Sequence, residues 1–182
     1  ERYEDVLDII KVKRKPGLFS QHAPTLLDNI TSKFVDALIE QGRRISPKSV
    51  LIAMNVVQTK EQELEVIRYF EFVIQRLDCQ DRNIHDHLLS LYAKHAPEKM
   101  GQYLSEFDTS SIEDLPFDIN HALILCLDKG LKKDLVTLYC ILNQLDKAVE
   151  MALAIDLEVA RKCISFADDQ ETRRNLWLRI AR

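Results

Sequence analysis

Apolar residues recur along most of the chain at intervals of three and four positions, the period of an amphipathic helix. Residues 61–77 carry the clearest pattern. One face of this stretch contains Leu64, Ile67, Phe70, Ile74 and Leu77, and a second face contains Val66, Tyr69, Phe70 and Val73. Because only a narrow polar strip remains, we expect this helix to be covered on two sides, as in the middle of a stack of helices.

Residue types that begin and end helices divide the first hundred residues into short segments. Pro16-Gly17 should stop the segment that precedes it. Helix starts are expected at Pro24, at Thr31 or Ser32, at Ser46-Pro47, after Asp81 and at Pro97, and a helix end at Gly42. The loops between these signals are short, which favours helices that run antiparallel to their neighbours.

After Asp118 the expected helices become regular. They cover residues 118–130, 131–145, 146–155 and 156–167, and the last runs from about Asp169. Their starts suggest a pair repeat of roughly 26 to 28 residues. Small residues recur where such helices would cross, at Ala122, Ala148, Ala152 and Ala160. This pattern predicts an all-α fold, an α-solenoid of short antiparallel helix pairs.

We expect residues 1–182 to form a single solenoid segment. The longest polar interruption is residues 108–118, where a weak subdivision is expected. Ile112, Leu115 and Phe117 should keep this loop packed against the helices, so it is not a linker.

Composition fits this fold and excludes several classes of protein. The chain has 46% hydrophobic and 30% charged residues, which excludes a disordered chain, and its 4 Gly and 5 Pro are few for a sheet of short strands. A net charge of −4 matches poorly a surface that must neutralise phosphates, so no nucleic-acid partner is expected. No apolar run approaches 18 residues and the start carries no signal-peptide pattern, so we expect a soluble, cytoplasmic protein.

Histidines and cysteines were the first candidates for chemistry. His85 and His87 lie two positions apart, which directs them away from each other on a helix, and Asp118 with His121 is a single acidic pair, explained by capping. The four cysteines lack zinc spacing, and Cys126 and Cys140 fall on apolar helix faces as buried thiols. We therefore predict no enzyme activity, no catalytic residue, no cofactor and no metal.

Aromatic residues are the remaining candidates for binding. Tyr69, Phe70 and Phe72 could form an exposed ridge, but their helical spacing favours the core. The same spacing favours core packing for Trp177, the only tryptophan. On the last helix, however, we expect Trp177 and Ile180 to need a further neighbour, so we also consider them a possible contact with a partner protein or with a next repeat.

Ordered segments of the chain carry a resemblance beyond composition. They are IRYFEFVIQRLDCQDRNIHDHLLSLYA from Ile67, HALILCLDKG from His121, VTLYCILNQLDKAVE from Val136, VEMALAIDLEVARKC from Val149 and LWLRIAR from Leu176. In this order they resemble the C-terminal α-solenoid region of the vacuolar protein sorting-associated protein 18 family, also called the deep orange or Pep3 family. The resemblance covers most of residues 20–182 and rests on structural positions.

The resemblance implies a right-handed helical stack related to clathrin heavy-chain repeats. It also implies a scaffold segment of a core subunit of the HOPS and CORVET tethering complexes, which dock endosomal, lysosomal or vacuolar membranes before fusion. The expected partners are the other class C subunits, and membrane association would be indirect, through the complex, on early endosomes and on late endosomes and lysosomes (vacuoles). The family's β-propeller and RING domain are not expected in these residues. The alternative is a generic helical-repeat adaptor that binds peptides in a concave groove.

Overall fold

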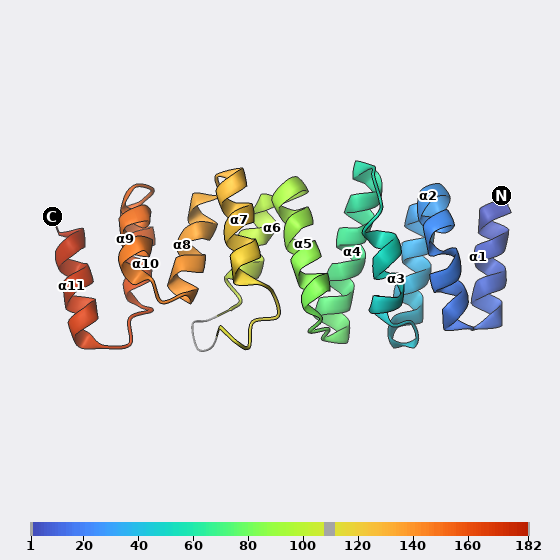
Figure 1. The fold of residues 1–182 in the computed structure, drawn as a ribbon, viewed down its shortest axis with the longest axis horizontal. Coiled ribbons are helices and arrows are strands. Elements are labelled where there is room, and N and C mark those ends of the chain that lie inside the picture. The colour runs from blue at the N-terminus through green and yellow to red at the C-terminus, as the bar shows by residue number, and fades with distance from the viewer. Residues whose placement is uncertain (1, 108–111, 182) are drawn as a thin grey trace. The chain divides into compact units, whose positions relative to one another are not determined.

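The computed structural model describes residues 2–107 and 112–181, which form eleven α-helices and one 3-10 turn and contain no strand (Figure 1). The first helices are α1 (Arg2–Lys13), α2 (Pro16–Gln41), the turn η1 (Gly42–Arg44), α3 (Pro47–Met54), α4 (Lys60–Leu77) and α5 (Arg82–His95). The others are α6 (Pro97–Leu104), α7 (Ile119–Lys129), α8 (Lys132–Ile141), α9 (Leu145–Leu153), α10 (Leu157–Ile164) and α11 (Gln170–Ile180). The predicted all-α fold is confirmed.

Contacts divide the chain into two compact units, Glu1–Leu91 and Tyr92–Arg182. The first unit holds α1 to α4 and most of α5, and the second holds the last turn of α5 and the helices that follow. Residues 108–111, within the segment where the sequence suggested a subdivision, lie outside the described residues.

In the first unit, α2 reverses direction at Ile30, the one residue inside it with non-helical dihedrals (φ −141°, ψ 47°). Two ion pairs require this reversal: Lys33 pairs with Glu4 (2.6 Å) and Lys11 with Glu40 (2.9 Å). A straight helix starting at Pro16 would carry Glu40 about 36 Å away from its start. The two halves of α2 therefore lie beside each other, as Figure 1 shows.

The expected separate helix near Thr31 is thus present, but its predicted cap is wrong. The Thr31 hydroxyl donates to the Leu27 carbonyl oxygen and accepts no backbone N–H. The preceding helix begins at Pro16, not at Pro24, because the first turn of a helix tolerates proline. Ser46 precedes Pro47 as expected, yet its side chain makes no cap hydrogen bond.

The first unit is held together by aromatic and aliphatic packing on both sides of α4. Val66, Ile67, Tyr69, Phe70 and Val73 are at most 4% exposed. Tyr69 and Phe70 therefore belong to the core, as their spacing indicated. On the neighbouring helix, the ring of Phe19 stacks on that of Phe34, with centroids 6.4 Å apart.

Leu64 is a correction to the predicted core face of α4, since it is 44% exposed. It lines a surface hollow with Ile30 and Thr31, opposite the point where α2 reverses. Because the chain leaves helical geometry at Ile30, none of the described helices covers this part of the first turns of α4.

Gln62 joins α4 to α2 at the same reversal. Its Oε1 accepts from the backbone N–H of Thr59 (3.0 Å) while the Thr59 hydroxyl accepts from the Gln62 N–H (3.3 Å), a capping box. Its Nε2 donates to the carbonyl oxygen of Leu27 (3.2 Å), near the end of the first half of α2. One buried side chain thus satisfies backbone groups at two helix ends.

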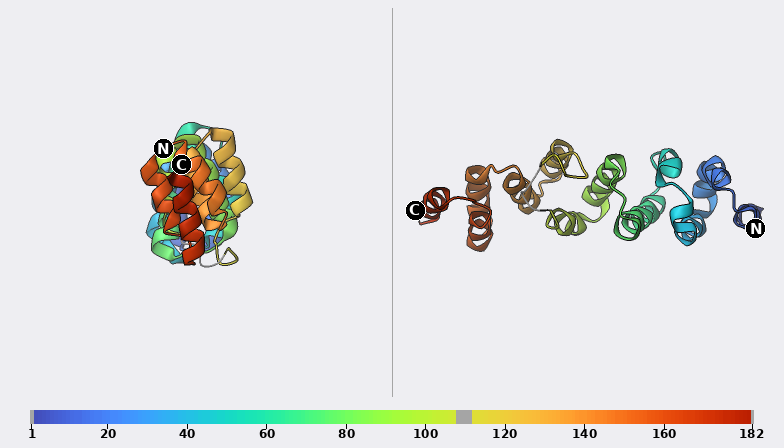
Figure 2. Two further views of the ribbon diagram at one scale, coloured as in Figure 1. Left: turned by 90° about the vertical axis from the view of Figure 1, so that its left-hand side faces the viewer. Right: turned by 90° about the horizontal axis from the view of Figure 1, so that it is seen from below.

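In the second unit, the helix starts recur at about the spacing expected from the sequence, one value within the range of roughly 26 to 28 residues and one just below it. α9 begins 26 residues after α7, and α10 begins 25 residues after α8. α9 lies against α8, α10 and α11 (Figure 2). Their shared core includes Ala148, Ala152 and Ala160, none of which is exposed. These small residues let the helices approach closely at their crossings.

Local signals place most helix ends of this unit correctly. Asp118 accepts from the N–H of Asn120 (2.9 Å), and Asp156 from that of Glu158 (3.1 Å). Gly130 follows α7 with φ 65°, a conformation that glycine adopts without strain. α8 ends earlier than expected, at Ile141, because Asn143 takes a left-handed conformation (φ 55°) that ends the helix.

Candidate interaction surface

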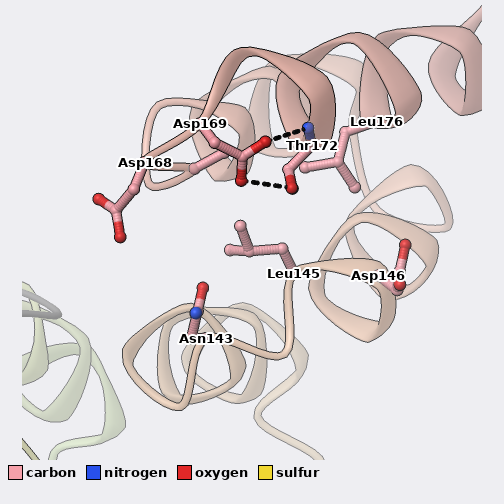
Figure 3. Close-up of a pocket in the computed structure, with 8 residues that line it drawn as sticks. Asn143, Leu145, Asp146, Asp168, Asp169, Thr172 and Leu176 are labelled. Atoms are coloured by element: carbon pink, nitrogen blue, oxygen red, sulfur yellow. Dashed lines mark hydrogen bonds between the residues drawn. The ribbon is translucent and has the colours of Figure 1, made fainter.

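The last helix, α11, is fixed at its first turn by Asp169. The Asp169 carboxylate accepts from both the backbone N–H and the hydroxyl of Thr172, each at 2.6 Å (Figure 3). These hydrogen bonds hold the pKa of Asp169 below its usual value. Farther along, Leu176 is 1% exposed and anchors the helix in the core with α9 and α10. Asp169 thus caps the helix that the sequence predicts to begin at about this residue.

The structure separates the two residues proposed from the sequence as a partner contact. Ile180 lies one turn beyond Leu176 and is partly buried against the same core. Trp177 lies about 100° around the helix from Leu176 and is 47% exposed, so the expected core position is wrong for this residue. Beside it, Leu178 is 55% exposed, so α11 presents an apolar surface formed by Trp177 and Leu178.

A small pocket lies between the start of α11 and the turn before α9 (Figure 3). Its acidic residues are Asp146, Asp168 and Asp169. Two of them already have partners, because Asp169 caps α11 and Asp146 pairs with Arg179 (3.1 Å). The pocket therefore belongs to the capping and packing of α11, and two of its three carboxylates interact with that helix.

The histidines lie in unrelated environments. His85 is 2% exposed, and its Nε2 donates to the Cys79 carbonyl oxygen (2.7 Å). His87 packs its ring edge-on against Phe70, with centroids 5.3 Å apart, and burial lowers the pKa of both histidines. Within residues 2–107 and 112–181, no three metal-binding side chains are arranged so that they could hold a metal ion.

The sequence favours buried thiols for all four cysteines, and this is confirmed for Cys126, Cys140 and Cys163 but is wrong for Cys79. Burial raises the pKa of Cys126 to about 12. A hydrogen bond with Cys163, together with burial, raises the pKa of Cys140. Only Cys79 is partly exposed. A thiol reacts as its thiolate, so these differences in burial and pKa set the rate at which each cysteine reacts with a thiol reagent.

We predict that a thiol reagent at pH 8 labels one cysteine of the native chain rapidly and all four after unfolding. At that pH only about one Cys126 in ten thousand is a thiolate, because its pKa lies about four units higher. The measurement is the absorbance released by an aromatic disulfide reagent. The Cys79→Ser variant should lose the rapid phase, and two or more rapid equivalents in the unmodified chain would contradict the described burial.

Comparisons with known proteins agree with this architecture. The family described as "VPS18, alpha-solenoid domain, second half" matches residues 1–182. The Danio rerio vacuolar protein sorting-associated protein 18 homolog is 37% identical over 99% of this chain, and the Drosophila melanogaster homolog is 35% identical over 100%. The Schizosaccharomyces pombe vacuolar membrane protein pep3 is 23% identical over 100% of the chain.

The chain spans about a fifth of the length of these relatives: 19% of the zebrafish protein, 18% of the fly protein and 21% of pep3. No solved structure matches it. Among the described residues, no helix is long and apolar enough to cross a membrane. The family match covers the whole chain, and the packed helix pairs of the second unit agree with it. This chain therefore belongs to the family of the second half of the VPS18 alpha-solenoid domain.

Proposed function

We propose that this chain is a scaffold segment of a core subunit of the HOPS and CORVET tethering complexes, which act in the docking and fusion of endosomal, lysosomal and vacuolar membranes. The observation that carries the proposal is the family match over residues 1–182. Its partners are the other class C vacuolar protein sorting subunits. It reaches the membranes of early endosomes, late endosomes and lysosomes (vacuoles) from the cytoplasm, through the complex.

The packing supports a structural role. In the second unit α6 and α7 pack on α8, α8 packs on α9, and α9 packs on α10 and α11, so the core is distributed along these helices. Such a stack presents helix edges and loops as docking surfaces and needs no central cavity. We infer that the segment acts by spacing and holding its partners, without a reaction of its own.

Within this role we propose that α11 contacts a partner subunit through Trp177, with Ile180 supporting the helix from the core side. Tryptophan is among the residue types enriched at interface hot spots, and Trp177 is half-exposed. The test is a pull-down of each class C subunit by the chain. Trp177→Ala should weaken binding to one subunit about 30-fold, the effect of a hot spot of about 2 kcal/mol.

Leu153→Ala is the matched control, because Leu153 is 39% exposed on α9 in the same unit. It should leave binding within about twofold of the unmodified chain. Ile180→Asp is a second variant, whose effect must be separated from folding by circular dichroism, because Ile180 packs on the core. Absence of binding to every class C subunit would overturn the proposed function, and equal binding by Trp177→Ala would overturn the contact alone.

A further inference from the structure

α6 and α8 approach each other closely in the second unit, where Gly101 faces Asp134. A Cβ atom at Gly101 would lie 2.8 Å from Oδ1 of Asp134, closer than such atoms come in proteins. The absence of a side chain at Gly101 therefore lets the carboxylate lie directly against the backbone of α6. This contact places a charged group inside the packing of two helices.

Asp134 has no partner among the described residues. Asp134 is only 9% exposed, yet its carboxylate forms no hydrogen bond and no ion pair within residues 2–107 and 112–181. Burial raises the pKa of this carboxyl above its ordinary value. The buried side chains of Gln62 and His85, by contrast, are both hydrogen-bonded. Among the described residues Nδ1 of His87 is also buried without a partner, but a carboxylate in such a position is the costlier group.

The carboxylate lines a surface hollow of about 400 Å³ between the first turns of the two helices. Pro97 and Leu131 give the hollow apolar walls, and Glu98 adds a second negative charge. Lys132 and Lys133 also border it, but they directly precede Asp134 on α8, and residues one and two positions apart on a helix do not face each other. Among the charged residues that line the hollow, Glu98, Lys132 and Lys133 are exposed and Asp134 is buried, so the buried charge of the hollow is negative.

We propose that this hollow binds an arginine side chain of a partner protein, with its guanidinium group on Asp134. The aliphatic part of arginine fits apolar walls, and its planar head donates two parallel hydrogen bonds to a carboxylate. A guanidinium is also less strongly hydrated than the ammonium of lysine, so it enters a partly buried site more easily. A metal ion is a poorer occupant, because no group of three metal-binding side chains able to hold an ion is found among the described residues.

The test uses the whole chain and a pair of small probes, N-acetyl-arginine amide and N-acetyl-citrulline amide. Citrulline has the length and shape of arginine but carries no charge. Binding is followed by the ¹³C resonance of the Asp134 carboxyl group. We expect a saturable shift with the arginine probe in the millimolar range, and at least about tenfold weaker binding of citrulline, because hydrogen bonds between charged groups are the stronger ones.

Asp134→Asn should abolish the response of neighbouring backbone amides to the arginine probe, whereas Asp128→Asn, an exposed position on α7, should keep it. Equal binding of arginine and citrulline would overturn the proposal. The proposal would also be overturned if N-acetyl-lysine amide bound more tightly than the arginine probe, or if Asp134→Asn kept its response to the arginine probe. A third contrary result is the absence of a saturable shift when the arginine probe is in 50-fold excess over the chain at about 1 mM. The comparison of arginine and citrulline probes uses the unmodified chain, so it does not depend on how a variant folds. It also does not depend on whether the chain assembles into a tethering complex.

Discussion

Replacing Phe70 with alanine should lower the free energy of unfolding by about 3–5 kcal/mol. Phe70 is fully buried on α4, and the edge of the His87 ring packs against it at a centroid distance of 5.3 Å. The substitution removes a large apolar group and leaves a cavity that the surrounding helices can close only partly. The measurement is urea unfolding followed by circular dichroism at helical wavelengths.

Phe72→Ala is the control, because Phe72 lies two residues away on the same helix and is only partly buried. It removes the same atoms and changes helix propensity in the same way. We expect its cost to be less than half that of Phe70→Ala. Equal costs at the two positions would contradict the described packing of α4.

Replacing Gln62 with methionine should cost about 2–4 kcal/mol, although the two side chains have nearly the same length and volume. The substitution removes the capping-box acceptor for the Thr59 N–H and the donor to the Leu27 carbonyl oxygen. Loss of a helix cap costs about 1 kcal/mol, and a buried backbone group left without a partner costs about 1–3 kcal/mol. Unfolding by urea again gives the value.

Gln62→Glu separates the two roles. The carboxylate still accepts at the start of α4, where a negative charge is favourable, but it cannot donate to Leu27 and lies near Asp28. We therefore expect Gln62→Glu to lower the free energy of unfolding, but by less than Gln62→Met does. Gln75→Met, at an exposed position on the same helix, should change stability by less than about 0.5 kcal/mol. If Gln62→Met left the free energy of unfolding unchanged, α4 would not be joined to α2 as described.

Helix ends could be predicted from the sequence where neighbouring residues alone decide them. Asp81, Asp118 and Asp169 accept backbone N–H groups two or three residues ahead, and Gly130 supplies the left-handed conformation after α7. These interactions are local, so residue type and position suffice. The repeat spacing of the last helices followed from the same signals.

Exposure could not be predicted in the same way, because it depends on what packs against a helix. Leu64 continues the apolar period of α4 but faces the reversal of α2, where no helix covers it. Trp177 follows the period of α11 loosely and lies about 100° from the buried Leu176. The unpaired carboxylate of Asp134 gave no signal either, since its burial arises from the close approach of Gly101, more than thirty positions earlier.

The reversal at Ile30 lies between these cases. The sequence indicated a new helix near Thr31, but not that the two halves of α2 would adjoin without a loop. What fixes the geometry is distant in sequence: the ion pairs of Lys33 with Glu4 and of Lys11 with Glu40 lie alongside α1, and Gln62 reaches back from α4. Such contacts form only after the chain has folded.

The scaffold role is tested most directly by measuring how much of the full-length protein assembles with the other class C subunits when this segment is destabilised. Phe70→Ala and Phe72→Ala are compared at a temperature where hydrogen exchange shows the segment unfolded in the first and folded in the second. A scaffold held together by these helices predicts that assembly falls with Phe70→Ala and persists with Phe72→Ala. Full assembly by a protein whose segment has unfolded would contradict it.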